Sequence, residues 1–156
     1  MENKSTNAPR VTDTQFQSIA ALALNFYQQG KLKEAETIFG GLQMINPKLY
    51  YTYAGLGAIA LAKQPIDLNA AYSNLSKAAE MNPNDASVQA NLGEALLRLG
   101  KLEEAKPHFE KAFQLDPGHN DPGANRARAI VSGLSIIANQ AMSAIQSRQK
   151  PVAKAS

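Results

Sequence analysis

The stretch LGEALLRLGKLEEAKPHFEKAFQLDP, residues 92–117, decides the fold of this chain. Counted from Leu92, its small residues, aromatic residues and proline fall at fixed offsets, at Gly93, Gly100, Ala105, Phe109, Ala112 and Pro117. The same spacing recurs upstream at Leu22, Ala23, Gly30, Ala35, Phe39, Leu42 and Pro47. A third copy lies between them, at Leu56, Gly57, Ala71, Leu75, Ala78 and Pro83, with two extra residues within 63–67. Three copies in register indicate an internal repeat of about 34 residues.

This spacing is typical of the tetratricopeptide repeat, a pair of short antiparallel helices. One pair cannot bury its own apolar face, so successive pairs stack, and small residues stand where helices approach most closely. Proline ends the second helix because it lacks an amide hydrogen and clashes with the preceding turn. The pattern predicts an all-α fold, a right-handed solenoid of three helical pairs followed by a long C-terminal helix.

The expected organisation has four parts. Residues 1–11 are polar and are expected to be disordered. Residues 12–121 hold the three repeats, at about 16–48, 50–84 and 86–119. A helix at 122–147 caps the third repeat, and 148–156 form a flexible basic tail. Thr12 or Asp13, Asp67, Asn84-Asp85 and Asp121 are the expected helix N-caps.

Composition narrows the range of functions. The chain has 156 residues and no cysteine, which excludes disulfides and thiolate chemistry. The first ten residues contain no apolar core, so no signal peptide is expected and the predicted location is the cytoplasm. Arg148, Lys150 and Lys154 account for the whole net charge of +3. Because these bases follow the repeats instead of forming a patch on a folded face, nucleic acid is not an expected partner.

No catalytic or metal-binding pattern is present. His108 and His119 are isolated from other metal-ligating or nucleophilic residues, and both are expected on the surface. Gly40-Gly41 matches neither a phosphate loop nor a dinucleotide fingerprint, and we expect it to permit close helix packing. The sequence therefore predicts a protein that is not an enzyme and needs neither a cofactor nor a metal.

The first helices of the pairs are expected to line the concave side of the solenoid. Helical register places there a set of small, aromatic and, toward the third repeat, polar residues: Gln17, Ala20, Leu24, Tyr27, Gln28, Tyr51, Ala54, Ala58, Leu61, Ser87, Ala90, Asn91, Glu94 and Arg98. Alanine leaves room for a bound backbone, and tyrosine offers apolar area with a hydrogen-bonding tip. Such a groove suits an extended peptide with a few apolar anchors.

The last helix is longer than a repeat helix requires. Its apolar residues repeat in alternating steps of three and four, at Ala124, Ala127, Val131, Leu134, Ala138, Ala141 and Ile145. Residues 129–147 carry no charge, but their serines, asparagine and glutamines argue against insertion in a membrane. We expect its second half to extend past the repeats, either exposed to solvent or buried against a client or a second subunit in a homodimer through Ile137, Ala141 and Ile145.

Two segments resemble a particular family. ALNFYQQGKLKEAETIF (residues 23–39), after Thr12-Asp13-Thr14, and YAGLGA (residues 53–58) resemble the class II chaperones of type III secretion systems. The resemblance implies a cytoplasmic chaperone that holds a hydrophobic translocator protein before export, with an extended translocator segment lying in the concave groove against aromatic residues. Tyr27 matches the tyrosine before the family's Gly-Lys turn, and Tyr53 falls close to the aromatic pair before Leu-Gly.

The chain also departs from that family. Leu32 stands where the family usually has a tyrosine, and the residues before Thr12 are too polar for the longer N-terminal helix implicated in the family's dimers. These differences leave a second function open, a generic tetratricopeptide adaptor in the assembly of a pilus or secretion apparatus.

Overall fold

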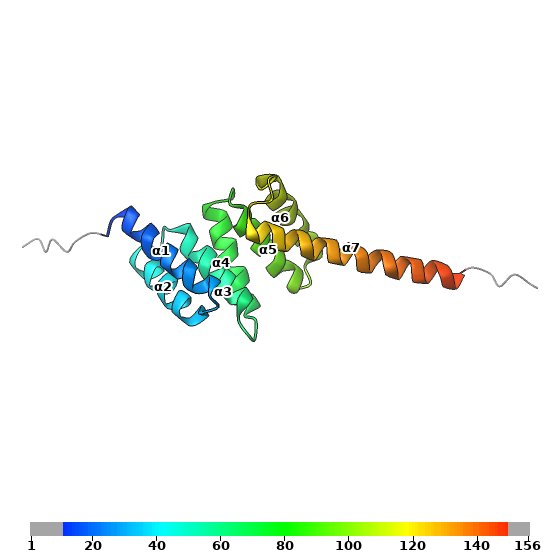
Figure 1. Cartoon of the computed structure of the whole chain (residues 1–156), viewed down its shortest axis with the longest axis horizontal. Coiled ribbons are helices and arrows are strands. Elements are labelled where there is room, and N and C mark those ends of the chain that lie inside the picture. The colour runs from blue at the N-terminus through cyan, green and yellow to red at the C-terminus, as the bar shows by residue number, and fades with distance from the viewer. Residues whose placement is uncertain (1–10, 150–156) are drawn as a thin grey trace, which may run out of the picture.

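The computed structural model describes residues 11–149, and this part of the chain folds into seven α-helices without a strand (Figure 1). The first six form three pairs, α1 (Asp13–Gln28) with α2 (Leu32–Ile45), α3 (Tyr50–Ala62) with α4 (Leu68–Met81), and α5 (Ala86–Arg98) with α6 (Leu102–Leu115). The pairs stack in chain order, and α7 (Pro122–Gln149) follows them. The predicted all-α solenoid fold is confirmed.

Local chemistry explains where the helices begin and end. Thr12 forms a capping box with Gln15, whose backbone N–H donates to Thr12 Oγ1 at 3.2 Å. The Asp67 and Asp85 carboxylates cap α4 and α5 by accepting hydrogen bonds from the backbone N–H groups of Ala70 and Val88. Gly30 and Gly100 follow α1 and α5 with φ of 74° and 79°, a left-handed conformation that glycine adopts without steric cost.

The small residues of the repeat lie where helices touch. A Cβ on Gly57 would stand 2.5 Å from the Leu75 side chain, and one on Gly93 would stand 2.8 Å from the Phe109 ring. The repeat pattern therefore records steric contacts between the two helices of a pair. Gly40 and Gly41 differ, since a Cβ on either would meet nothing within 4 Å, so the expectation that they permit close packing is wrong.

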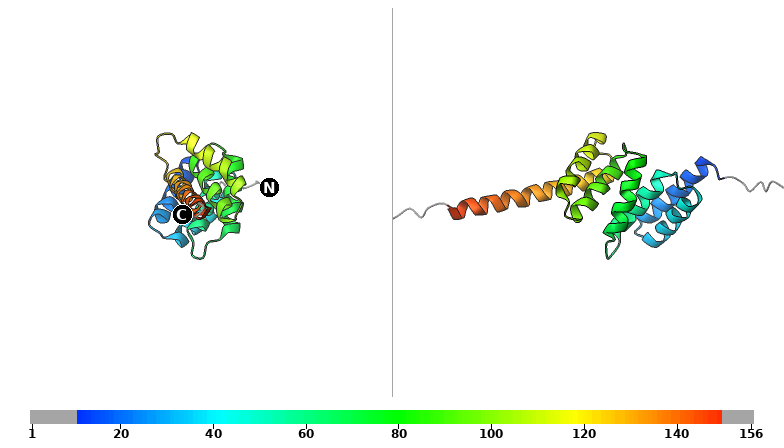
Figure 2. Two further views of the ribbon diagram at one scale, coloured as in Figure 1. Left: turned by 90° about the vertical axis from the view of Figure 1, so that its right-hand side faces the viewer. Right: turned by 180° about the vertical axis from the view of Figure 1, so that it is seen from behind.

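α7 packs on the third repeat only with its first turns. Ala124 and Ala127 are buried there, and Val131 packs against the same core cluster. The rest of the helix projects away from the repeats, as the side views show (Figures 1 and 2). The helix ends at Gln149, so Arg148 lies in its last turn and not in a tail. Lys150 and Lys154, like residues 1–10, lie outside the described residues.

By length and composition, the span Pro122–Arg148 of α7 is long and apolar enough to cross a membrane, with a mean hydropathy of 1.2 in its most apolar window. The buried alanines of its first turns attach that end of the helix to the repeats.

Candidate peptide-binding groove

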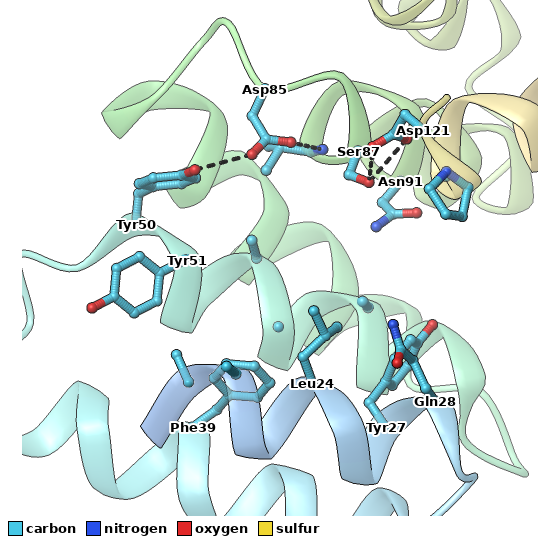
Figure 3. A pocket seen from close by; sticks show the side chains of 18 of the residues that line it. Leu24, Tyr27, Gln28, Phe39, Tyr50, Tyr51, Asp85, Ser87, Asn91 and Asp121 are labelled. Carbon is cyan, nitrogen blue, oxygen red and sulfur yellow. Dashed lines mark hydrogen bonds between the residues drawn. The ribbon is translucent and has the colours of Figure 1, made fainter. Parts of the chain in front are cut away.

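A groove of about 560 Å³ opens between α1, α3, α5 and the N-terminus of α7 (Figure 3). One side is formed by small and apolar residues of α1 and α3, with the Phe39 ring of α2. The other side is formed by polar residues at the start of α5 and of α7. The groove therefore offers an apolar surface faced by a row of hydrogen-bonding groups.

The apolar side is hollow because its residues are small. Ala20 from α1 and Ala54 and Ala58 from α3 are half-buried, and the exposed Leu24 side chain opens into the space between them. Gly55 lets the Phe39 ring reach the groove, because a Cβ at this position would stand 2.5 Å from that ring. A bound segment would meet mainly carbon atoms along this side, which favours apolar side chains.

Two tyrosines stand at one end of the groove. The Tyr50 hydroxyl donates to Asp85 Oδ2 at 3.1 Å, and its ring meets the Tyr51 ring edge-to-face with centroids 5.8 Å apart. Burial, together with the Asp85 carboxylate, raises the pKa of Tyr50, so its hydroxyl stays protonated and donates at neutral pH. Burial also raises the pKa of Tyr51. Tyr50 thus holds the Tyr51 ring beside the groove.

The other end is closed by the start of α7. Ser87 of α5 donates to Asp121 Oδ2 at 2.8 Å, and Asp121 Oδ1 accepts from the backbone N–H of Ala124 at 2.7 Å. Gly123 allows this approach, because a Cβ there would stand 2.9 Å from Ser87 Oγ. Arg126 extends along the same wall and donates to Asn91 Oδ1 at 2.5 Å. The N-cap of α7 is therefore also a wall of the groove.

Ten of the residues that the sequence predicts for the groove line it: Gln17, Ala20, Leu24, Tyr27, Gln28, Tyr51, Ala54, Ala58, Ser87 and Asn91. Five others do not line it: Tyr53, Leu61, Ala90, Glu94 and Arg98. Leu61 and Ala90 belong to the buried core, and Tyr53 lies on a different face of α3 from Tyr51.

Glu94 and Arg98 do not form the polar end of the groove that the sequence predicted, and have another role. Glu94 is only 4% exposed, and its carboxylate pairs with Arg98 at 2.8 Å and with Arg126 of α7 at 2.9 Å. α7 covers the concave face of α5 at this level, so the groove ends one turn earlier than helical register alone indicates. The ion pair between Arg126 and Glu94 attaches α7 to the third repeat.

Sequence reasoning missed several lining residues, namely Ala21, Phe39, Tyr50, Gly55, Asp85, Val88, Asp121, Pro122, Gly123 and Arg126. A signal existed for Tyr50, which stands four and eight residues before Ala54 and Ala58 and so shares their helical face. The α7 residues carried no such signal, because helical periodicity does not show which face of the solenoid the last helix covers.

The charged lining residues are Asp85, Asp121 and Arg126. Within residues 11–149, no three His, Asp or Glu side chains form a group that could hold a metal ion. His108 is half-buried, not on the open surface as expected, with Nδ1 2.7 Å from Gln89 Oε1, and burial lowers its pKa. It lies outside the groove, so the groove can bind and orient a ligand but brings together no nucleophile with a base.

Comparison with known proteins agrees with this geometry. The tetratricopeptide repeat family model matches residues 86–119. PcrH from Pseudomonas aeruginosa is similar in structure, with a TM-score of 0.64 and 26% identity over 81% of this chain and 96% of PcrH. PcrH in complex with the chaperone binding region of PopB gives a TM-score of 0.61 and 28% identity over 76% of this chain and 95% of PcrH.

The type III secretion translocator chaperone SycD of Yersinia enterocolitica is also similar, with a TM-score of 0.61 and 25% identity over 78% of this chain and 91% of SycD. No curated protein sequence gives a significant match. The predicted resemblance to the translocator chaperones of type III secretion is confirmed, and the chain has the fold of a peptide-binding tetratricopeptide protein.

Proposed function

We propose that this protein is a cytoplasmic chaperone of type III secretion, which holds an extended segment of a hydrophobic translocator protein in its groove until export. The observation that carries the proposal is the groove itself, an open apolar channel faced by hydrogen-bonding groups. The structural similarity to PcrH, which has been solved with the chaperone binding region of PopB, supports it. The protein acts by binding, without catalysis.

The two sides of the groove define the chemistry of the segment. Apolar side chains of the client pack on Leu24 and among the alanines, with Tyr27 and Tyr51 as anchors. The client backbone is extended, because a helix would leave its amide groups unable to reach the polar side, whereas an extended chain presents N–H groups outward. Asp85 and Asp121 accept such donors, and they disfavour client carboxylates at this side.

The proposal explains why a client would need this partner. A translocator segment with exposed apolar side chains aggregates when free, and covering it in the groove removes that surface from water. A generic adaptor would instead bind a segment of a protein that is stable alone.

The test is purification of the tagged full chain from its native cell, with identification of the bound protein by mass spectrometry. We expect a secreted protein with long apolar stretches, which is insoluble when expressed alone and soluble when co-expressed with this chain. The Tyr27→Ala/Tyr51→Ala double variant should lose it, whereas Lys111→Ala, outside the groove, should retain it. A partner that is a soluble, constitutive component of a machine would contradict the chaperone function and favour the adaptor.

A further inference from the structure

The apolar stripe of α7 continues beyond the part that packs on the repeats. At about 100° per residue, Leu134, Ile137, Ala138, Ala141 and Ile145 fall on the side of the helix that carries the buried Ala127. Leu134, Ile137 and Ile145 are nevertheless exposed. One face of a single helix is thus covered over its first turns and uncovered over the rest.

Apart from the exposed Ile136, the opposite side of this segment is mainly polar, and it is uncharged. It carries Ser132, Ser135, Asn139, Gln140, Ser143 and Gln146. A membrane-spanning helix would bury these groups in lipid without partners, and a helix lying on a membrane surface typically carries lysines and arginines on its polar side. Residues 129–147 contain neither. An exposed apolar stripe on a helix whose opposite side is mainly polar and uncharged favours burial of the stripe against another protein helix.

We propose that the covering helix is α7 of a second copy of this chain, in an antiparallel pair. Apart from Ile137, which lies at the edge of the stripe, the pattern is the same in both directions, with Leu134 and Ile145 at its ends and Ala138 and Ala141 between them. In an antiparallel pair about a two-fold axis, Leu134 lies opposite Ile145, and Ala138 lies opposite Ala141. The alanines let the two helices approach closely while the larger residues fill the ends.

The shape of the molecule selects the antiparallel arrangement. Seen along the long axis, α7 lies within the outline of the repeats (Figure 2). Two packed helices stand only about 8–10 Å apart, so a parallel pair would force the two repeat domains to overlap. The antiparallel pair places them at opposite ends. It also leaves both grooves open, since the groove is on the repeats and the stripe lies beyond them.

The interface is small. Burial of the stripe on both copies removes on the order of 1,000 Å² from water, near the lower limit for a specific association. We therefore expect a dimer that dissociates on dilution. This inference does not depend on the proposed function, because it concerns a different surface.

The test is sedimentation velocity of the full chain from low to high micromolar concentration. The mass should rise from 16.7 kDa toward twice that value. Ile137→Glu should raise the dissociation constant at least about tenfold. Ile136→Glu is the matched control, because Ile136 is 57% exposed against 64% for Ile137 but stands on the polar side, and it should dimerise as the wild type does.

Engineered cysteines test the orientation, because the chain has none of its own. Oxidation should cross-link Ala138→Cys, near the two-fold axis, and leave Ile145→Cys monomeric, whereas a parallel pair would cross-link both. Three results would overturn the inference: a wild type that stays monomeric, a dimer that Ile137→Glu leaves intact, or equal effects of the two glutamate variants. A monomer that binds phosphatidylcholine vesicles through Ile137 would assign the stripe to lipid instead.

Discussion

The concave face of this solenoid is covered at one end and open at the other. On the third repeat, α7 occupies it, with Ala127 buried and Arg126 paired to Glu94. On the first and second repeats, Ala20, Ala54 and Ala58 line an open groove. Small residues face inward in both regions, so the residue types alone do not show whether a surface is filled. We propose that the open end accepts a segment of the same kind, apolar with a hydrogen-bonding partner at its edge.

Disrupting the docking of α7 on the third repeat should have the largest effect, a loss of stability. Ala127 is 1% exposed, so Ala127→Glu buries a charge without a partner and should cost on the order of 3 kcal/mol of the free energy of unfolding. The melting temperature should fall by roughly 10 °C. Ala141→Glu, on the exposed part of the same helix, should leave the melting temperature of the dilute protein unchanged. Thermal unfolding followed by circular dichroism compares the two, and equal melting temperatures would contradict the docking.

Filling the open end of the groove should have the second largest effect. Ala54→Arg places a long charged side chain in the middle of the groove, where Ala54 is half-buried and faces the space that a segment would occupy. The affinity for the co-purified partner should fall by more than about a hundredfold, with little change in melting temperature. Ala62→Arg, at the exposed end of the same helix, is the control and should bind normally. Calorimetric titration measures both affinities.

A smaller loss is expected from a single anchor. Tyr51→Ala removes an aromatic ring from the groove and should weaken binding by about 2 kcal/mol, or roughly thirtyfold. Tyr53→Ala removes the same side chain two residues away on the same helix, outside the groove. Partner affinity by fluorescence anisotropy should separate the two variants. If Tyr53→Ala lowers the affinity for the partner as much as Tyr51→Ala does, the binding groove does not lie where the structure places it.

The smallest effect concerns acid stability at the docked end. The Arg128 guanidinium, 2.9 Å from Asp116 Oδ2, and the backbone N–H of Asn120 lower the pKa of Asp116 below its usual value. A carboxyl whose pKa is lower in the folded state stabilises the fold above its unfolded-state pKa of about 3.9, and this contribution is lost as the pH falls through the folded-state pKa.

Asp116→Asn removes this titration. The melting temperature of the wild type should therefore decline more steeply than that of the variant as the pH is lowered from 5 toward 3. Parallel declines in the two proteins would show that the Arg128 contact does not link α6 to α7.

Sequence reasoning predicted the fold because each repeat position has a local steric cause. Gly57 and Gly93 must be small to admit Leu75 and Phe109, and Asp67 and Asp85 must accept hydrogen bonds at helix starts. These requirements act within one helical pair, so they are visible at fixed spacing. Periodicity likewise identified part of the lining of α1 and α3, including Ala20, Ala54 and Ala58.

The predicted lining residues were wrong mainly where a segment distant in the chain determines which residues line the groove. Ala90, Glu94 and Arg98 occupy the expected face of α5, but α7 covers that face. The sequence predicts a helix that caps the third repeat and does not show which face this helix covers. Tyr53 was assigned by likeness to a family motif, whereas helical register favours Tyr50. Arg126 contributes to the groove only because α7 docks, so sequence alone offered no reason to select it.

The most direct test of the groove is site-specific photocrosslinking in the native cell. A photoreactive phenylalanine analogue replaces Tyr51 in one variant and Tyr53 in another, and the cross-linked partner and its attachment site are identified by mass spectrometry. We expect the Tyr51 position to cross-link to one extended, apolar segment of a secreted protein and the Tyr53 position not to cross-link to it. Cross-linking of that partner from Tyr53 with none from Tyr51 would contradict the placement of the groove.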